Sequence, residues 1–221
     1  QHLRWQGEAW TTRLLLMVLQ RRSHKTIRRG IHAARVVAQP LLTKRLDTAA
    51  TNLVRVYGHQ LSDEQRQRVA ARSLDSFFLS CLESIIQPVD DRQILVEGDG
   101  LNELFRLHKE GKGLIVGSLH LGCWDIGLRW LSAHLPNLSV IYRPAHNPYT
   151  DRLLNRARSS NSQCHWIPQA NAKTMLKSLN GGRSLVMMTD LYPFSNDLQA
   201  DFLGLTTQVP KGPLALSQKA G

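Results

Sequence analysis

The chain has few cysteines and no long apolar run, and both absences narrow its class. Three cysteines in 221 residues, with no Cys-x-x-Cys pair, argue against a disulfide framework or a zinc knuckle and favour a reducing compartment. The sequence contains no apolar span of about twenty residues and no signal-peptide core, so it predicts no membrane-crossing helix. Hydrophobic residues still make up 42% of the chain, which excludes a disordered tail and predicts a packed core.

Acidic residues are scarce in the first quarter of the chain. Residues 1–60 carry 11 Lys and Arg against 2 Asp and Glu, a net charge of +9, whereas residues 61–221 carry 17 against 15, a net charge of +2. This excess predicts an anionic partner surface. Trp5 and Trp10 precede the apolar run Leu14–Leu19, and arginines follow it. The pattern favours a helix at a bilayer interface over a nucleic-acid surface. The alternative is a solvated basic helix pair packed on the rest of the protein.

The spacing of apolar residues changes near residue 90. Residues 1–90 show helical spacing, with Gly58 as a helix end and Ser62 as the next helix start. Residues 91–221 alternate short apolar runs with helical stretches, which predicts an α/β fold with a largely parallel sheet flanked by helices. The predicted strands are 113–119, 138–142, 165–167 and 184–188, and the predicted helices are 124–134, 149–159, 172–179 and 212–219. We therefore expect a basic, membrane-associating helical region (1–90) and a catalytic α/β domain (91–221) whose sheet continues beyond the end of the chain.

His120 directly follows a predicted buried strand, and Asp125 lies five residues further on. Parallel α/β proteins place their chemistry at the carboxyl ends of strands. Residues five apart do not share a face of a continuous helix, so these side chains can meet only if the chain turns at Gly122. Asp125 would then fix one imidazole tautomer and leave the other ring nitrogen as a general base. His59 and His146 also have an acid five residues on, but neither follows a buried strand. A buried structural histidine is the alternative.

The segment GLIVGSLHLGCWDIG resembles the lipid A late acyltransferases of Gram-negative bacteria, which belong to the lysophospholipid acyltransferase superfamily. The family's histidine and acid, separated by four residues after a strand, are matched by His120 and Asp125, although many members carry glutamate at the second position. The following segment, IYRPAHNPYTDRLLNRAR, resembles a second family block, an arginine–proline pair before an asparagine–proline pair. Arg143 and Asn147 match those two pairs. A downstream arginine of the family is best matched by Arg158.

Arg156 is a rival match for that downstream arginine. Two later blocks extend the resemblance, which runs from about Asn52 to the end of the chain. A strand followed by an aspartate is matched by Val186–Asp190, and a Phe-x-Gly-like turn by Asp201–Gly204. The residues between these blocks, Leu-Tyr-Pro-Phe after the aspartate, are less polar than the acidic run usual in the family.

The resemblance implies a glycerol-phosphate acyltransferase-like fold. It also implies transfer of a fatty acyl group from acyl carrier protein or coenzyme A to a hydroxyl of a membrane glycolipid, foremost a lipid A precursor. It implies an anionic membrane surface as partner, no nucleic acid, no cofactor and no metal, and a location at the cytoplasmic face of the bacterial inner membrane. The implied catalytic residues are His120 and Asp125, and the implied substrate-binding residues are Arg143, Asn147, Arg158 and Asp190. The alternatives are another glycolipid or a lysophospholipid as acceptor and, in a different class, a non-enzymatic basic membrane-binding protein.

Acyl transfer to an alcohol requires a base for the hydroxyl proton, donors for the oxyanion and a site that holds both substrates. His120 can supply the base, and Arg143 or Arg158 can supply the donors or bind a phosphate. Asp190 can orient an arginine or the acceptor, or cap a helix. Ser118 and Cys123 flank the histidine, but neither lies in a Gly-x-Ser-x-Gly turn, so a Ser-His-Asp hydrolase is the weaker alternative.

Overall fold

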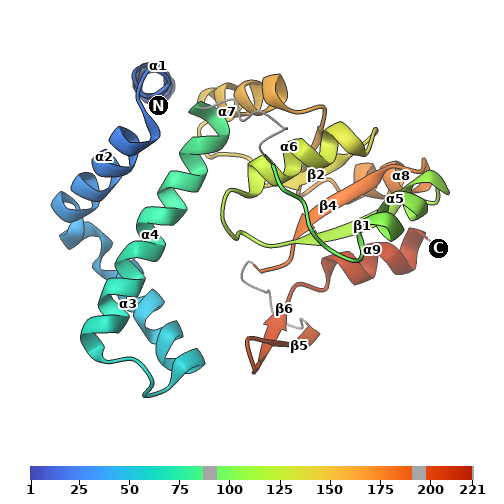
Figure 1. The fold of residues 1–221 in the computed structure, drawn as a ribbon. Helices are drawn as coiled ribbons and strands as arrows, with labels where there is room; N and C mark the ends of the chain where they lie inside the picture. The colour runs from blue at the N-terminus through green and yellow to red at the C-terminus, as the bar shows by residue number, and fades with distance from the viewer. Residues whose placement is uncertain (87–93, 191–197, 221) are drawn as a thin grey trace.

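Four helices form the N-terminal part of the protein in the computed structural model, which describes residues 1–86, 94–190 and 198–220 (Figure 1). They are α1 (His2–Leu19), α2 (His24–Val37), α3 (Gln39–Tyr57) and α4 (Asp63–Ile86). Gly58 ends α3 with a positive φ of 56°, as predicted. The start of α4 is a capping box, because the Gln65 backbone N–H donates to Ser62 Oγ and the Ser62 N–H donates to Gln65 Oε1. The predicted boundary at residues 90 and 91 lies outside the described residues.

The second part is built on a four-stranded parallel sheet, so the predicted α/β fold is confirmed. Its strands are β1 (Leu114–Ser118), β2 (Ser139–Tyr142), β3 (His165–Pro168) and β4 (Ser184–Met188), in the order β1-β4-β2-β3. The helices of this part are α5 (Leu101–Lys109), α6 (Trp124–His134), α7 (Pro148–Asn161), α8 (Ala172–Asn180) and α9 (Gly212–Ala220). Strand β4 lies beside β1 although it is the last of the four in the chain, and Ser118 pairs in register with Met188.

Both faces of the sheet are covered, which is usual for parallel sheets. On one face, Leu128 of α6 and Leu135, the residue directly after α6, pack with Val140 and Val186 of the sheet, and α5 adds Leu104 and Phe105. On the other face, α8 and α9 pack on the sheet through Met175, Leu179 and Leu216. The two apolar cores fix the strand ends from which the site residues project.

The N-terminal helices contact the sheet domain through α1, which packs on α7, and through α4, which packs on α6 and α7. Leu16 of α1 and Ile27 of α2 are buried in a small apolar cluster with Leu153 of α7. An ion pair of 2.6 Å between Arg35 and Asp75 joins α2 to α4. Across the described ranges, no helix has both the length and the apolar composition that a membrane crossing requires.

A two-stranded antiparallel hairpin, β5 (Leu198–Phe202) and β6 (Leu205–Val209), forms a second sheet apart from the first. The sequence predicted only a turn at Asp201–Gly204. The hairpin projects from the sheet domain between β4 and α9 in chain order (Figure 1).

Candidate active site

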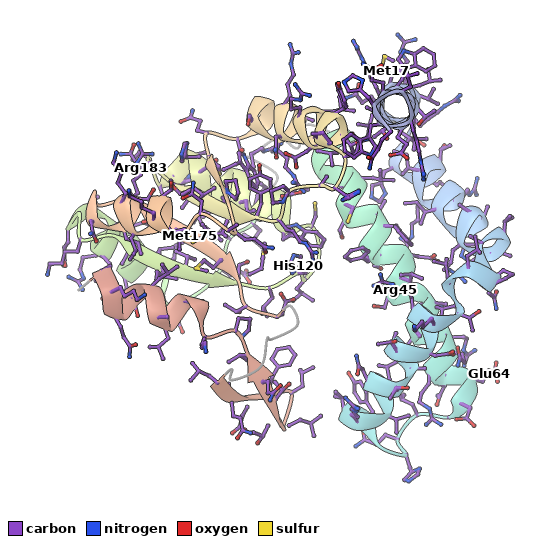
Figure 2. The ribbon with its side chains drawn as sticks, turned by 180° about the vertical axis from the view of Figure 1, so that it is seen from behind. Met17, Arg45, Glu64, His120, Met175 and Arg183 are labelled. Carbon is purple, nitrogen blue, oxygen red and sulfur yellow. The ribbon has the colours of Figure 1, made fainter. Side chains whose placement is uncertain are left out.

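The site is centred on His120, which lies in the loop after β1 (Figure 2). Gly122 has a φ of 58°, so the chain turns there as predicted before α6 begins. The imidazole Nδ1 lies 2.8 Å from Asp190 Oδ1, and the His120 backbone N–H donates to Asp190 Oδ2 at 2.7 Å. Because an ionised carboxylate only accepts hydrogen bonds, Nδ1 carries the proton and Nε2 is left as the basic nitrogen.

The position of Asp190 follows from the strand order. Asp190 comes two residues after Met188, the last residue of β4, and His120 comes two residues after Ser118, the last residue of β1. Those last residues are paired in register, so the two side chains emerge next to each other. The ring of Trp124 packs edge-on against the imidazole, with centroids 4.8 Å apart, and limits its rotation.

Asp125 does not occupy the place predicted for it beside the imidazole. It lies in the first turn of α6 with its side chain only 10% exposed, and its Oδ2 lies 3.6 Å from Nε of Arg158 on α7. Among the hydrogen bonds and ion pairs of the described residues, the carboxylate that contacts His120 is that of Asp190. Asp125 therefore pairs with an arginine of the site, and both residues line the same cavity as His120.

Arg158 is the more strongly positioned of the predicted arginines. Its guanidinium lies over the ring of Trp166 on β3, 5.3 Å from the centroid, in a cation–π contact. Within the described ranges its Nε is buried without a hydrogen-bond partner, because the 3.6 Å to Asp125 Oδ2 makes an ion pair but is too long for a hydrogen bond. Arg143, directly after β2, also lines the cavity. Arg156, the rival match two residues before Arg158, is not among the lining residues.

Asn147 lies outside this group and has structural contacts. Its side-chain oxygen accepts from the backbone N–H groups of Tyr149 and Thr150, so Asn147 is the N-cap of α7. Its amide nitrogen donates to the backbone oxygen of Trp5 at 2.9 Å and to Glu8 at 3.1 Å. The residue predicted to bind substrate thus joins α1 to α7.

An apolar cavity of about 600 Å³ opens beside the histidine. Its polar residues include His120, Asp125, Arg143, Arg158 and Lys219. Its walls continue past the ends of β2 and β4 to Met175 and Leu176 of α8 and to Ala215 and Leu216 of α9. Lys219 and Trp166 carried no motif in the sequence, and only the fold brings them to the cavity.

The residues flanking His120 do not form a serine or cysteine nucleophile. Ser118 lines a separate cavity of about 320 Å³, between β1 and α6, and not the one that His120 lines. Burial raises the pKa of the Cys123 thiol to about 11, so the neutral thiol prevails at neutral pH. Across the described ranges, no three His, Cys, Asp or Glu side chains are grouped as a bound metal would require.

A parallel α/β fold that carries a histidine–aspartate pair at adjacent strand ends, beside an apolar cavity, has the layout of an enzyme that handles an apolar substrate. The chain belongs to the bacterial lipid A biosynthesis acyltransferase family, which it matches over residues 1–221, its whole length. The family predicted from the sequence is confirmed, as is the prediction of an acyltransferase enzyme rather than a non-enzymatic binder. No curated protein sequence matches the chain closely enough to serve as a relative.

Proposed function

We propose that this chain transfers a fatty acyl group from acyl carrier protein or coenzyme A to a hydroxyl of a membrane glycolipid, with a lipid A precursor as the acceptor. The observation that carries the proposal is the bonded pair of His120 and Asp190 beside the apolar cavity. Membership of the lipid A biosynthesis acyltransferase family supports the same reaction.

His120 acts as the general base in this proposal, through Nε2. Asp190 holds the imidazole by Nδ1 and by the adjacent backbone N–H, so Nε2 is kept free of a proton and fixed in direction. The carboxylate also favours the imidazolium that forms during the reaction. A positioned base of this kind contributes about 10²–10⁴-fold to the rate.

The transfer then proceeds without a covalent enzyme intermediate. Nε2 removes the proton of the acceptor hydroxyl as its oxygen attacks the thioester carbonyl, which forms a C–O bond and a tetrahedral oxyanion. The C–S bond breaks as the oxyanion collapses, and the imidazolium returns its proton to the departing thiolate. Atoms and charge balance, and the products are the ester and the free thiol.

Arg158 is the donor that we assign to the oxyanion or to a phosphate of a substrate. Its buried Nε–H has no hydrogen-bond partner among the residues that the structure describes, so an anionic oxygen in the cavity would satisfy it. Asp125 and Trp166 hold the guanidinium from two sides. Asp125 is therefore a positioning residue for the arginine, and the catalytic role predicted for it acts through Arg158.

The cavity provides a place for the acyl chain of the donor. Its volume of about 600 Å³ lies within the roughly 300–1,000 Å³ of small-molecule sites. Methionine, leucine and alanine side chains of α8 and α9 form its far wall. A hydrocarbon chain gains most from leaving water for such a surface.

The N-terminal helices are the part that we propose to associate with an anionic membrane, at the cytoplasmic face of the bacterial inner membrane. Trp10 of α1 is 66% exposed and Leu15 is 55% exposed, although Leu16 between the helices is buried. Residues 1–60 carry the net charge of +9.

Sedimentation tests this association: it should show binding to anionic vesicles that weakens as salt rises, because salt screens the attraction. Equal binding to neutral vesicles at every salt concentration would contradict the electrostatic part.

Acyl transfer by the purified protein tests the reaction. Labelled acyl thioesters of acyl carrier protein and of coenzyme A are incubated with a lipid A precursor or a lysophospholipid, and the products are separated by mass. The His120→Ala variant should lose at least about 100-fold in rate. His59→Ala is the matched control, because His59 also has an acid five residues on but is exposed after α3. A folded, fully active His120→Ala protein, or an equally inactive His59→Ala protein, would refute the assignment.

A further inference from the structure

The β5–β6 hairpin has an apolar face that no part of its own sheet covers. Among the strands that the structure describes, β5 and β6 pair only with each other, and every residue from Leu198 to Gln208 is exposed. A lone two-stranded hairpin is marginally stable in water, so its side chains usually pack on something else. The hairpin also carries a single charged side chain, Asp201, in the range 198–209.

The strand register separates the hairpin into two unlike faces. Successive residues of a strand point to opposite faces, and directly paired residues share a face. The pairs Leu198–Val209, Ala200–Thr207 and Phe202–Leu205 form one face, which is apolar except for the threonine. The pairs Gln199–Gln208 and Asp201–Thr206 form the other face, which is polar.

The turn of the hairpin is chemically unusual. Leu203 and Gly204 both have positive φ, of 52° and 76°, which is the geometry of a two-residue type I′ turn. Asn or Asp followed by Gly is usual there, and a bulky residue at positive φ is a conformational outlier. Leu203 is nevertheless 64% exposed, so neither the backbone geometry nor packing against the described residues explains why a leucine stands at this position.

We propose that the tip and apolar face of this hairpin insert into the interface of an anionic phospholipid bilayer. This inference rests on the proposed function, in which the acceptor is a membrane lipid, and it adds a membrane contact next to the active site. The net charge of +11 attracts the chain to such a surface, and +9 of it lies in residues 1–60. The charge therefore draws the protein as a whole to the bilayer, whereas the hairpin contributes apolar side chains. A protein partner fits this face less well than a bilayer does, because stable protein–protein interfaces use about 20–30 residues on each side and the apolar face of the hairpin has six.

The hairpin also brings that contact close to the cavity. Pro210, directly after β6, and Gly212, the first residue of α9, line the cavity that His120 lines. Asp190, the partner of His120, precedes β5 in the chain. A tip held in the bilayer interface would keep the cavity at the membrane surface, where a lipid acceptor lies.

A probe at the hairpin tip tests the proposal on the whole chain. Figures 1 and 2 both show the hairpin far from α1, so the readout has to be local to the hairpin. An environment-sensitive dye is attached to the Leu203→Cys variant, and to Leu95→Cys as the control, because Leu95 is 82% exposed on a different segment. Labelling near pH 7 is selective, because burial raises the pKa of all three native cysteines.

Vesicles containing phosphatidylglycerol should shift the emission of the probe at position 203 to the blue, and the probe at position 95 should not respond. The Leu203→Asn variant should bind these vesicles at least about threefold more weakly than Leu95→Asn, while its thermal midpoint is unchanged or higher, since Asn tolerates positive φ. No emission shift at position 203, or equal losses in the two asparagine variants, overturns the proposal. A shift that needs no vesicles and grows with protein concentration also overturns it, in favour of a second copy of the chain.

Acyl transfer in detergent separates this proposal from the proposed function. Leu203→Asn should keep wild-type activity on a detergent-dispersed acceptor and lose activity on vesicle-borne acceptor. If the wild type transfers no acyl group in either format, the proposed function fails while the emission shift still decides the hairpin contact.

Discussion

Replacing Asp190 by asparagine distinguishes the carboxylate seen beside His120 from the one predicted there. Asp190 accepts two hydrogen bonds, from Nδ1 and from the backbone N–H of His120. An asparagine has one acceptor oxygen, so keeping the backbone bond turns its NH₂ group toward Nδ1. That geometry favours the tautomer with the proton on Nε2, which cannot act as a base.

The size of the loss is bounded by the whole contribution of the base. General-base catalysis contributes about 10²–10⁴-fold, so Asp190→Asn cannot cost more than His120→Ala does. The Asp190 side chain is 25% exposed, so water can replace part of its hydrogen bond to the imidazole in the variant. We therefore expect a loss in kcat of about 10³-fold, within the range of about 10²–10⁴-fold for the whole base. This loss corresponds to about 4 kcal/mol in the activation free energy. Asp125→Asn leaves the imidazole bonded and should cost only about 10–100-fold, or about 1–3 kcal/mol.

The assay is single-turnover acyl transfer with the single variants and the double variant, with circular dichroism to confirm folding. Because Asp190 acts through His120, adding Asp190→Asn to His120→Ala should cause no further loss. If the two losses multiply instead, Asp190 acts on the substrate directly. If Asp125→Asn is as inactive as His120→Ala while Asp190→Asn stays active, the His120–Asp125 pair predicted from the sequence is the functional one.

Three further outcomes follow from the structure. Asn147→Ala removes the cap of α7 and two hydrogen bonds to α1, which together cost about 3 kcal/mol in the free energy of unfolding. The thermal midpoint should therefore fall by about 6–12 °C in a melt followed by circular dichroism, and an unchanged midpoint would contradict this. Alkylation of Cys123 at pH 8, measured by intact mass, should be about 100-fold slower than alkylation of free cysteine, because only the thiolate reacts. The rate should increase as the pH rises toward 11, and a fast reaction at pH 8 would contradict the raised pKa. Ala215→Leu should narrow the cavity and lower the kcat/KM ratio for long over short acyl donors about tenfold, and an unchanged ratio would place the acyl chain elsewhere.

Local patterns in the sequence predict most of the sheet domain. The apolar runs at 113–119 and 184–188 become β1 and β4, because a strand buried on both faces has to be apolar throughout. Gly122 is required where the chain turns before α6, and its positive φ confirms the turn. These features depend on neighbours in sequence, which a pattern records.

The partner of His120 depends on strand order, which no local pattern records. Asp190 reaches the imidazole only because β4 lies beside β1, 70 residues away in the chain. The five-residue spacing to Asp125 suggested a contact, but the first turn of α6 directs that side chain toward Arg158 on α7. Asn147 was assigned to substrate binding from the family block alone, and its contacts with α1 involve residues about 140 positions away.

Mass spectrometry of lipids from bacterial cells tests the central claim most directly. Cells that express the full-length gene are compared with cells that carry no copy and with cells that express the His120→Ala variant at the same level. The proposed function predicts a lipid A species heavier by one acyl chain only with the unaltered gene. An identical lipid profile in all three strains, or the same heavier species with His120→Ala, would contradict it.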